Sequence, residues 1–481
     1  MMNKQLQSMS PQLSNADLAP EIDQQWSWYS IFAFWMSDVH SVGGYVFAAS
    51  LFALGLAGWQ VFVCLLAGIM IVYLFANLMG TPGQKAGVPF PVVCRLAFGV
   101  KGANIPAIIR GCIAVVWYGI QTYLASSSFI ILALYFFPSL KTLQSESFVG
   151  LSYLGWMGFL FMWIAQALVF MFGMPMIRKV IDYSGPAIYI AMFALCGFML
   201  YQTGWSAIHF NLSSKSLVGW NNVKEMIIAI ALVAGYFAGP TLNFSDFARY
   251  CKNKKQMKVG NLLGLPLNFI VFSIFSVLIV SASIPMFGQM ITDPIKTVQM
   301  LDSATITVLG ALTFILATIG INIVANFVSP AFDFSNIAPQ KISFKWGGFI
   351  AAIASLLMTP WNLFNNPDMI HYTVDLLAAL IGPLYGIVLV DYYRIRKQKI
   401  HLSSLYNDTK NGQYWYNNGW NTRAIIALII AGCASILSSF VFTELANFSL
   451  FISGAVAGVS YHWLMAKSTV SIEVVEAQTN L

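Results

Sequence analysis

The sequence predicts an all-α protein that crosses a membrane about twelve times. Hydrophobic residue types make up 58% of the 481 residues and charged types only 9%, whereas soluble domains hold about 45–50% and about 25% of these types. Because one spanning helix needs about 20 apolar residues, this composition provides for roughly ten to twelve helices. A large soluble domain and a disordered chain are both excluded by so many apolar and so few charged residues.

Polar interruptions divide the apolar stretches into twelve candidate spans. Backbone N–H and C=O groups find no partner in lipid, so each span is expected to be an α-helix, in which these groups bond one another. The expected spans are 27–51, 56–79, 104–137, 150–174, 184–202, 225–245, 261–285, 304–330, 346–362, 370–390, 423–442 and 447–466.

The positions of Lys and Arg predict the orientation of the spans. With the N-terminus in the cytoplasm, 21 of the 25 cations fall on the cytoplasmic side, Arg95 and Arg110 among them. The other four lie in outer loops, at Lys141, Lys215, Lys224 and Lys296. The positive-inside rule then predicts an inner or plasma membrane protein with both termini cytoplasmic. The basic runs 249–258 and 394–397 are interpreted as cytoplasmic anchors, and no nucleic-acid partner is expected.

Two spans contain residues that interrupt a helix. In the first span, Gly43-Gly44 follow an acid and a histidine and are expected to unwind. In the sixth, Gly239-Pro240 should break the helix near mid-depth, because proline lacks an N–H and crowds the preceding turn. Transporters expose backbone to a polar solute with such pairs of broken helices in two repeats. The separation of five spans therefore predicts a five-plus-five inverted repeat followed by two additional helices.

This organisation divides the chain into five parts. They are a cytoplasmic tail (1–25), the first repeat (26–203), the second repeat (204–400), spans 11 and 12 with the loop before them (401–466) and a second cytoplasmic tail (467–481).

The third span of each repeat carries polar residues at helical spacing. Trp117 and Gln121 lie four residues apart in one, and Asn322 and Asn326 lie four apart in the other, so each pair shares a face of its helix. An indole offers a surface for stacking, and each amide offers a donor and an acceptor. A planar solute edged with C=O and N–H groups needs this combination, although buried amides also join neighbouring helices.

Acids within membrane spans are costly and usually functional. Asp38 is the first candidate for a coupling role, with His40 close enough to titrate with it, whereas Asp375 is equally well explained as a water-exposed acid. Acids at the ends of two spans are expected to form structural ion pairs, Asp246 with Arg249 and Asp391 with Arg394.

Six motifs resemble those of nucleobase–cation symporter family 1, which includes hydantoin, allantoin, cytosine and uracil permeases. The resemblance covers nearly the whole chain. The motifs are Gly87-Val88-Pro89-Phe90-Pro91-Val92 with Arg95 and Phe98-Gly99; Gly102-Ala103-Asn104-Ile105-Pro106; Trp117-Tyr118-Gly119-Ile120-Gln121-Thr122; Asn243-Phe244-Ser245-Asp246-Phe247-Ala248-Arg249; Asn322-Ile323-Val324-Ala325-Asn326 with Ser329-Pro330-Ala331; and Gly382-Pro383 with Asp391-Tyr392-Tyr393.

The resemblance implies the leucine-transporter-like fold and a set of substrate-binding residues. Trp117 and Phe237 would stack on the substrate ring, with Tyr236 as the alternative to Phe237, and Ser41 completes the set beside the first break. Gln121 and Asn322 would bond the edge of the ring, and Asn326 would order the site. Phe237 departs from the Trp of hydantoin and allantoin permeases, which leaves the accepted ring size open.

The resemblance also implies positions for a coupling ion. Relatives that use sodium hold it between the first and eighth spans, and the matching residues here are Ser37, His40, Ala317, Gly320 and Ile321. Both hydroxyl groups expected from the eighth span are missing, which would weaken a sodium site. Since Asp38 lies in the same segment of the first span, H⁺ is favoured over Na⁺, and no other cofactor or metal is expected.

The sequence therefore predicts a secondary active transporter that imports a nucleobase or a related planar ureide by cation symport, with no oligomer required. The motif around Trp117 and Gln121 resembles the uracil, allantoin and hydantoin branch of the family more than the cytosine and purine branch. Uracil is the first choice, and the alternative is an allantoin or hydantoin permease, possibly sodium-coupled. A channel or a membrane enzyme is a distant alternative, because neither a filter loop nor an HExxH or GxSxG motif is visible.

Overall fold

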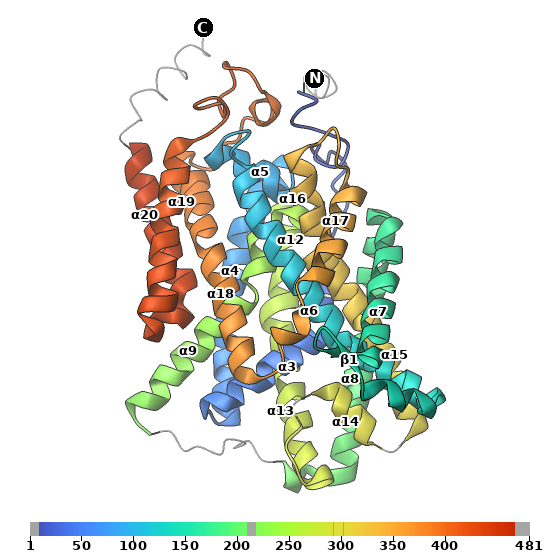
Figure 1. Ribbon diagram of the computed structural model, residues 1–481. Coiled ribbons are helices and arrows are strands. Elements are labelled where there is room, and N and C mark those ends of the chain that lie inside the picture. The colour runs from blue at the N-terminus through green and yellow to red at the C-terminus, as the bar shows by residue number, and fades with distance from the viewer. Residues whose placement is uncertain (1–8, 209–217, 292, 302, 467–481) are drawn as a thin grey trace.

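The computed structural model describes residues 9–208, 218–291, 293–301 and 303–466, which form one bundle of helices (Figure 1). Nine helical segments of this described part are long and apolar enough to cross a membrane. They are α4 (Gly58–Ala86), α6 (Asn104–Phe136), α7 (Tyr153–Met171), α8 (Met174–Thr203), α12 to α13 (Lys254–Phe287), α15 to α16 (Ala304–Ile337), α18 with its extension (Pro367–Ile395), α19 with its extension (Thr422–Val441) and α20 with the turn before it (Thr443–Ala466).

The three remaining predicted spans are shorter or broken. The first consists of α2 (Trp28–Val39) and α3 (Val42–Ser50), and the sixth of α9 (Trp220–Tyr236) and α10 (Ala238–Leu242). The ninth is α17 (Phe344–Leu357). All twelve predicted spans thus have a helical counterpart, and the prediction of an all-α membrane protein is confirmed.

Large apolar side chains cover the outer faces of the bundle. Ile190 and Val459 are each 71% exposed, and Leu357 is 78% exposed. A soluble monomer rarely leaves wide apolar surfaces open, so these faces are suited to contact lipid.

The first helix breaks at His40 and Ser41, two residues before the expected glycines. Ser41 caps α3 by accepting a hydrogen bond from the N–H of Gly44, at 2.9 Å, so the backbone N–H groups at the start of α3 are partly satisfied. Gly43 and Gly44 therefore lie inside α3, and the prediction that they unwind is wrong. Their small size instead allows close packing, because a Cβ at Gly43 would lie 2.7 Å from Nε2 of Gln121.

The sixth helix breaks at Phe237, which ends α9 and precedes α10. Gly239 and Pro240 lie inside α10, so the expected place of the break was three residues too late. The cause is still the proline, because an α-helical N–H at position 240 would have bonded the carbonyl of Tyr236, four residues earlier. The regular helix ends at Tyr236 and begins again at Ala238.

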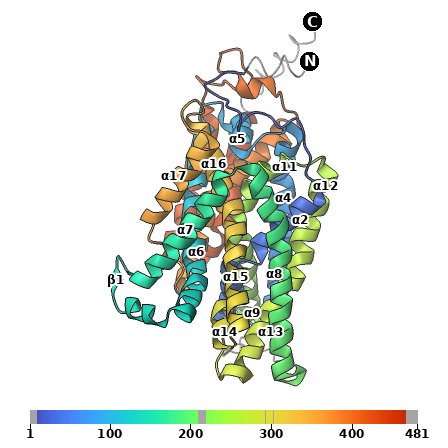
Figure 2. The ribbon, with the colours of Figure 1, turned by 90° about the vertical axis from the view of Figure 1, so that its right-hand side faces the viewer.

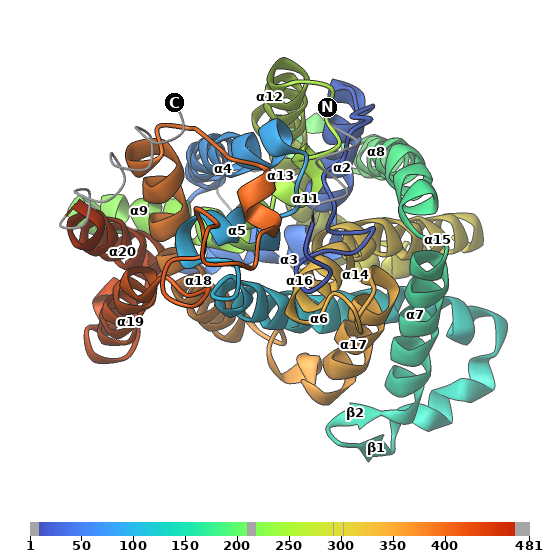
Figure 3. The same cartoon turned by 90° about the horizontal axis from the view of Figure 1, so that it is seen from above.

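The long helices surround an oblique central helix, α6. α6 packs against α7, α15, α16 and α17, and α15 also packs against α8 (Figure 2). On the other side of the bundle, α4 packs against α9. Seen from above, α19 and α20 lie at one edge, where they pack on α18 (Figure 3), in keeping with their expected place as additions.

Both ends of the described chain lie at one end of the bundle, which we call the terminal face. Here the segment before α2 runs across several helix ends. The N–H of Trp26 bonds the carbonyl of Tyr250 at 2.8 Å, and Ser10 bonds Asp408 at 2.7 Å. Arg95 donates to the carbonyl of Leu13 at 2.7 Å. Residues 10–26 therefore connect segments from both halves of the chain.

Three of the cations that the sequence assigns to the cytoplasmic side are buried. Arg95 and Arg110 are 0% exposed and Arg249 is 2% exposed. Arg249 donates to the backbone carbonyls of Gly87 and Asp17. Backbone carbonyl oxygens thus accept hydrogen bonds from these guanidinium groups, which is why they can be buried.

The two expected ion pairs at helix ends are not formed. Asp391 pairs with Arg396 at 2.7 Å, five residues along the chain, in place of Arg394. Asp246 accepts the backbone N–H of Phe90 at 2.7 Å. The short helix that begins there, α5 (Phe90–Phe98), supplies a free N-terminal N–H group, which is a favourable partner for a carboxylate.

Two local features were not predicted. α8 begins at Met174, ten residues before the expected span, and its first turns carry an ion pair between Arg178 and Asp182 at 3.7 Å. A small hairpin of β1 (Ser147–Phe148) and β2 (Leu151–Ser152) lies between α6 and α7, at the end away from the terminal face.

Candidate functional site

A small cavity lies in the interior of the bundle, where the two broken helices approach α6 and the eighth span. Its volume is about 20 Å³, which is room for about one water molecule. The residues that line it are Asp38, Trp117, Gln121, Tyr236, Phe237, Pro240, Ile321, Ala325 and Asn326. A planar ring therefore does not fit in the cavity as it stands.

Three of the nine residues that line the cavity are aromatic. Tyr236 lies edge-on against Trp117, with ring centroids 5.1 Å apart, and stacks on Phe47 at 4.4 Å. Phe237 contacts Phe269 edge-on at 5.3 Å. Both sequence candidates for the aromatic of the sixth helix thus line the cavity, and Tyr236 is the one in contact with Trp117.

Two buried acceptor atoms of the cavity have no hydrogen-bond partner in the described residues. They are Oδ2 of Asp38 and Oε1 of Gln121, and their side chains come from α2 and α6. The amide nitrogen of Gln121 makes only a long contact of 3.4 Å with the hydroxyl of Tyr236. Because a buried acceptor without a donor is unfavourable, this cavity is prepared to receive N–H or O–H groups.

The eighth span is π-helical where its two asparagines lie, in η5 (Asn322–Val328) between α15 (Ala304–Ile321) and α16 (Ser329–Ile337). Such widened turns often occur at functional sites. Asn326 lines the cavity and donates to Oδ1 of Asn322 at 2.9 Å. Asn322 lies behind it and donates to Oε1 of Gln166 at 2.7 Å and to Thr122 at 3.0 Å.

The positions expected for a coupling ion surround a pair of hydroxyl groups. The Oγ atoms of Ser37 and Ser184 lie 2.9 Å apart. A Cβ at Gly320 would lie 2.6 Å from the Oγ of Ser184, so α8 and α15 meet closely at this point. Ala317 is buried nearby in α15, and Ile321 also lines the cavity.

Three other residues considered from sequence bond away from the cavity or lie outside it. His40 bonds the hydroxyl of Tyr45 at 2.7 Å and Asn268 at 3.0 Å. Ser41 caps α3, as described above. Asp375 lies half-buried on α18 (Pro367–Leu389) and is absent from the lining of the cavity.

Arg110 is a residue beside the site that the sequence analysis placed only among the cytoplasmic cations. Its guanidinium donates to the carbonyls of Gly239 and Ala325, each at 3.2 Å, and to Oδ1 of Asn243 at 2.8 Å. It thereby joins α6 to the sixth and eighth spans beside the cavity. The signal in the sequence was an arginine six residues inside a predicted span, where a charge needs partners.

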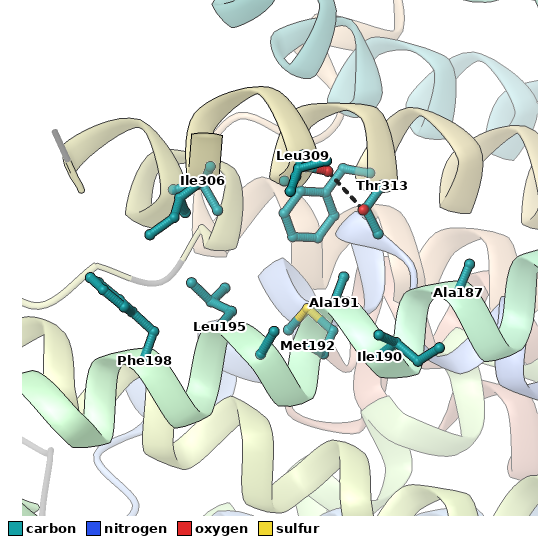
Figure 4. Close-up of a pocket in the computed structure, with 13 residues that line it drawn as sticks. Ala187, Ile190, Ala191, Met192, Leu195, Phe198, Ile306, Leu309 and Thr313 are labelled. Carbon is teal, nitrogen blue, oxygen red and sulfur yellow. Dashed lines mark hydrogen bonds between the residues drawn. The ribbon is translucent and has the colours of Figure 1, made fainter. Parts of the chain in front are cut away.

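A larger hollow on the outside of the bundle has a different character. It lies between α8 and α15, measures about 560 Å³ and is lined almost entirely by apolar side chains such as Ile190, Leu195 and Leu309 (Figure 4). Its only hydroxyl, on Thr313, donates to the carbonyl of Leu309. With no polar group free to recognise a solute, this groove is suited to hydrocarbon and not to a planar polar molecule.

Comparison with known proteins places these features in a family. A model of the family described as permease for cytosine/purines, uracil, thiamine, allantoin matches residues 19–465. The allantoin permease of Bacillus subtilis is 31% identical over 481 residues, which cover 98% of each protein. The purine-uracil permease of Arabidopsis thaliana is 30% identical, over 95% of this chain and 78% of that protein.

The fold is also known from solved structures. A nucleobase-cation-symport-1 family transporter, in a closed conformation with bromovinylhydantoin bound, matches with a TM-score of 0.74 at 22% identity. The match covers 95% of this chain and 96% of that one. A Na⁺-coupled sialic acid symporter matches with a TM-score of 0.61 at 13% identity, over 95% and 94% of the two chains.

Two broken helices meet at a cavity that carries polar side chains, in a leucine-transporter-like fold. Together with the family match, they define a multi-pass membrane transporter and not an enzyme. The motifs in the sequence and the family model indicate the same family of transporters. The chain belongs to the permease family for cytosine/purines, uracil, thiamine and allantoin, whose members carry nucleobase-like solutes. The resemblance to nucleobase–cation symporter family 1 is thereby confirmed.

Proposed function

We propose that the protein imports a nucleobase or a related planar ureide, with uracil as the first choice, by symport with protons. The observation that carries this proposal is the pair of unpartnered acceptors, Asp38 Oδ2 and Gln121 Oε1, in one cavity beside the indole of Trp117. Substrate N–H groups would supply the missing donors, and the indole would supply the stacking surface.

The two faces and the edge of a uracil ring match the groups of the cavity. Oε1 of Gln121 would accept one ring N–H, and the amide hydrogen of Asn326 that is not bonded to Asn322 would donate to a ring carbonyl. Trp117 would stack on one face and Phe237 on the other. Because the cavity holds only about 20 Å³, the Tyr236 ring must swing away from Trp117 before the substrate enters.

Asp38 is the proposed proton carrier. Its free carboxylate oxygen faces the same cavity as the substrate groups, so protonation and substrate binding would influence each other directly. Neither Gly320 nor Ile321 offers a hydroxyl group for sodium. In the sodium-coupled alternative, the hydroxyls of Ser37 and Ser184, which lie together at 2.9 Å, would serve as oxygen ligands.

The proposed orientation has the terminal face in the cytoplasm of an inner or plasma membrane. The cation-rich segments support it. Lys85 donates to the carbonyl of Gln398 at this face, and the backbone N–H of Lys252 donates to the carbonyl of Trp26 there. The positive-inside rule assigns such a face to the cytoplasm.

Allantoin is the second candidate substrate. It is favoured by the allantoin permease of Bacillus subtilis, which matches this chain over 98% of both proteins. Allantoin carries the same adjacent C=O and N–H groups as uracil, but it also carries a flexible ureido group that needs more room beyond the ring.

Uptake of radiolabelled solute in cells that lack other uracil and allantoin permeases tests the proposal. Expression of this chain should give uracil accumulation that collapses when a protonophore is added and that does not depend on sodium. Accumulation of allantoin without uracil would reverse the order of the two substrates, and sodium-dependent accumulation would overturn proton coupling.

A further inference from the structure

A second group of buried polar atoms without partners lies beside the cavity, on the side of the terminal face. Arg110 and Asp333 are both 0% exposed. Nη1 of Arg110 and both carboxylate oxygens of Asp333 have no hydrogen-bond partner in the described residues. Buried polar groups are normally satisfied, so these atoms are placed to meet something that the fold does not itself provide.

The guanidinium of Arg110 is held next to the cavity by its other N–H groups. Nη2 donates to the carbonyl of Ala325, which lines the cavity. Nε donates to the carbonyl of Gly239, the residue before the cavity-lining Pro240, and to Asn243. These bonds fix the guanidinium and leave Nη1 as its free donor.

Asp246, a neighbouring buried acid, has hydrogen-bond partners on both of its carboxylate oxygens. Asp246 is also 0% exposed, but its oxygens accept from the N–H of Phe90 at 2.7 Å and from Asn243 at 2.9 Å. Asp333 has no such bonds, although the charges of Arg110 and Asp246 act on it. A structural role therefore accounts for Asp246 and leaves Asp333 unexplained.

Arg110 and Asp333 lie on the same two helices as the cavity residues Trp117 and Asn326, but two helical turns nearer the terminal face. Arg110 lies seven residues before Trp117 on α6. Asp333 lies seven residues after Asn326 on the eighth span, and Ser329 lies between Asn326 and Asp333. Residues seven apart share a helix face and lie about 10 Å apart along its axis. Polar groups thus follow one another along these two helices from the cavity toward the terminal face.

The combination of free atoms selects the chemistry of the ligand. A cation would satisfy Asp333 but would be repelled by Arg110, and an anion would have the opposite difficulty. A neutral molecule with a carbonyl next to an N–H satisfies both, because the carbonyl accepts from Nη1 and the N–H donates to the carboxylate. Uracil, allantoin and hydantoins all carry this amide edge.

We propose that Arg110 and Asp333 form a second, transient binding station for the amide edge of the transported solute, between the central cavity and the terminal face. This inference rests on the proposed substrate class. The solute would leave the stacking site of Trp117 and bind here when the bundle opens toward the terminal face.

Alkylation of a single cysteine at the station provides the test. Ser329 is 0% exposed, so Ser329→Cys, in a protein whose six native cysteines are replaced by alanine, reacts with a maleimide only when this path is open. The probes are uracil, allantoin, hydantoin, cytosine and adenine. The protein is compared with intact Trp117, with Trp117→Ala, and with Trp117→Ala combined with Asp333→Asn. Asp375→Asn in place of Asp333→Asn is the control, because Asp375 lies outside both groups.

The proposal expects one of the probes to slow alkylation about fivefold or more at several times its Kd, in proportion to occupancy. Protection should persist at millimolar probe in Trp117→Ala, disappear with Asp333→Asn, and remain in the Asp375→Asn control. Protection that is lost with Trp117→Ala alone would overturn the station and leave the central site in place. Protection that survives Asp333→Asn would mean that the free atoms hold water or pair with each other, and it would also overturn the station.

A protein with intact Trp117 that none of the probes protects would overturn the proposed substrate class, and the station with it. If Asp333→Asn does not fold, Asp333→Glu provides the same comparison. The longer side chain keeps the carboxylate but shifts it by one methylene, so protection should be weakened and should require a higher probe concentration.

Discussion

Gly43 lies directly against the side-chain amide of Gln121. A Cβ at position 43 would stand 2.7 Å from Nε2 and 2.8 Å from Oε1 of Gln121, closer than carbon atoms normally approach polar atoms. The missing side chain thus lets the broken first helix pack on α6 at the cavity. The same contact fixes the position of the amide that we assign to substrate recognition.

Gly43→Ala should therefore impair transport without unfolding the protein. The added methyl group must displace the Gln121 amide, and losing one hydrogen bond to a substrate costs about 1 kcal/mol, or more than fivefold in affinity. Uptake kinetics would show the effect as a raised KM. Gly197→Ala is the control, because a Cβ at Gly197 meets nothing within 4 Å; equal effects of the two changes would argue against a specific contact.

Trp117→Ala should abolish high-affinity substrate binding while leaving expression intact. Stacking of a base on an aromatic side chain contributes about 1–3 kcal/mol, so the dissociation constant should rise roughly 5- to 150-fold, and Trp117→Phe should recover part of the loss. The measurement is substrate-induced thermal stabilisation of the purified protein. Trp346, 59% exposed on the outer face, gives the control Trp346→Ala, and near-normal affinity of Trp117→Ala would show that the indole only packs.

Asp38→Asn should abolish accumulation driven by a proton gradient. The amide is similar in shape but does not bind and release a proton near neutral pH, so exchange of labelled for unlabelled substrate across the membrane should survive while concentrative uptake is lost. Proteoliposomes with an imposed pH gradient separate the two activities. Asp375→Asn should retain both, and accumulation by Asp38→Asn that follows sodium instead of pH would contradict proton coupling.

The fold and the residues around the cavity could be predicted from the sequence, but the positions at which the backbone leaves the helix could not. Helical spacing placed Trp117 and Gln121 on one face of α6, and both line the cavity. It did not distinguish a glycine that unwinds a helix from one that permits close packing, since that depends on a partner far along the chain. Gly43 shows this, because its neighbour Gln121 is 78 residues away.

The partners of buried charged residues also could not be predicted from their neighbours in the sequence. Nearby cations suggested ion pairs for Asp246 and Asp391, but the structure gives Asp246 the N–H of Phe90, 156 residues away. Likewise, the buried guanidinium of Arg110 donates to the carbonyls of Gly239 and Ala325, which are 129 and 215 residues away. Such partners appear only when the helices are assembled.

The two asparagines of the eighth span should separate into a structural and a recognition residue. The side chain of Asn322 bonds Gln166, Thr122 and the carbonyl of Tyr118, and it accepts from Asn326. Asn322→Ala would leave several buried groups unsatisfied, at about 1–3 kcal/mol for each such group, and should lower the apparent melting temperature of the substrate-free protein. Asn326→Ala removes an amide that lines the cavity and makes one bond to Asn322, so it should change melting far less. Its main effect should be a raised KM for uptake, by about tenfold.

Thermal melting without substrate, combined with uptake kinetics for both variants, checks this division. Equal loss of melting temperature in both variants would show that the asparagines act as one structural unit.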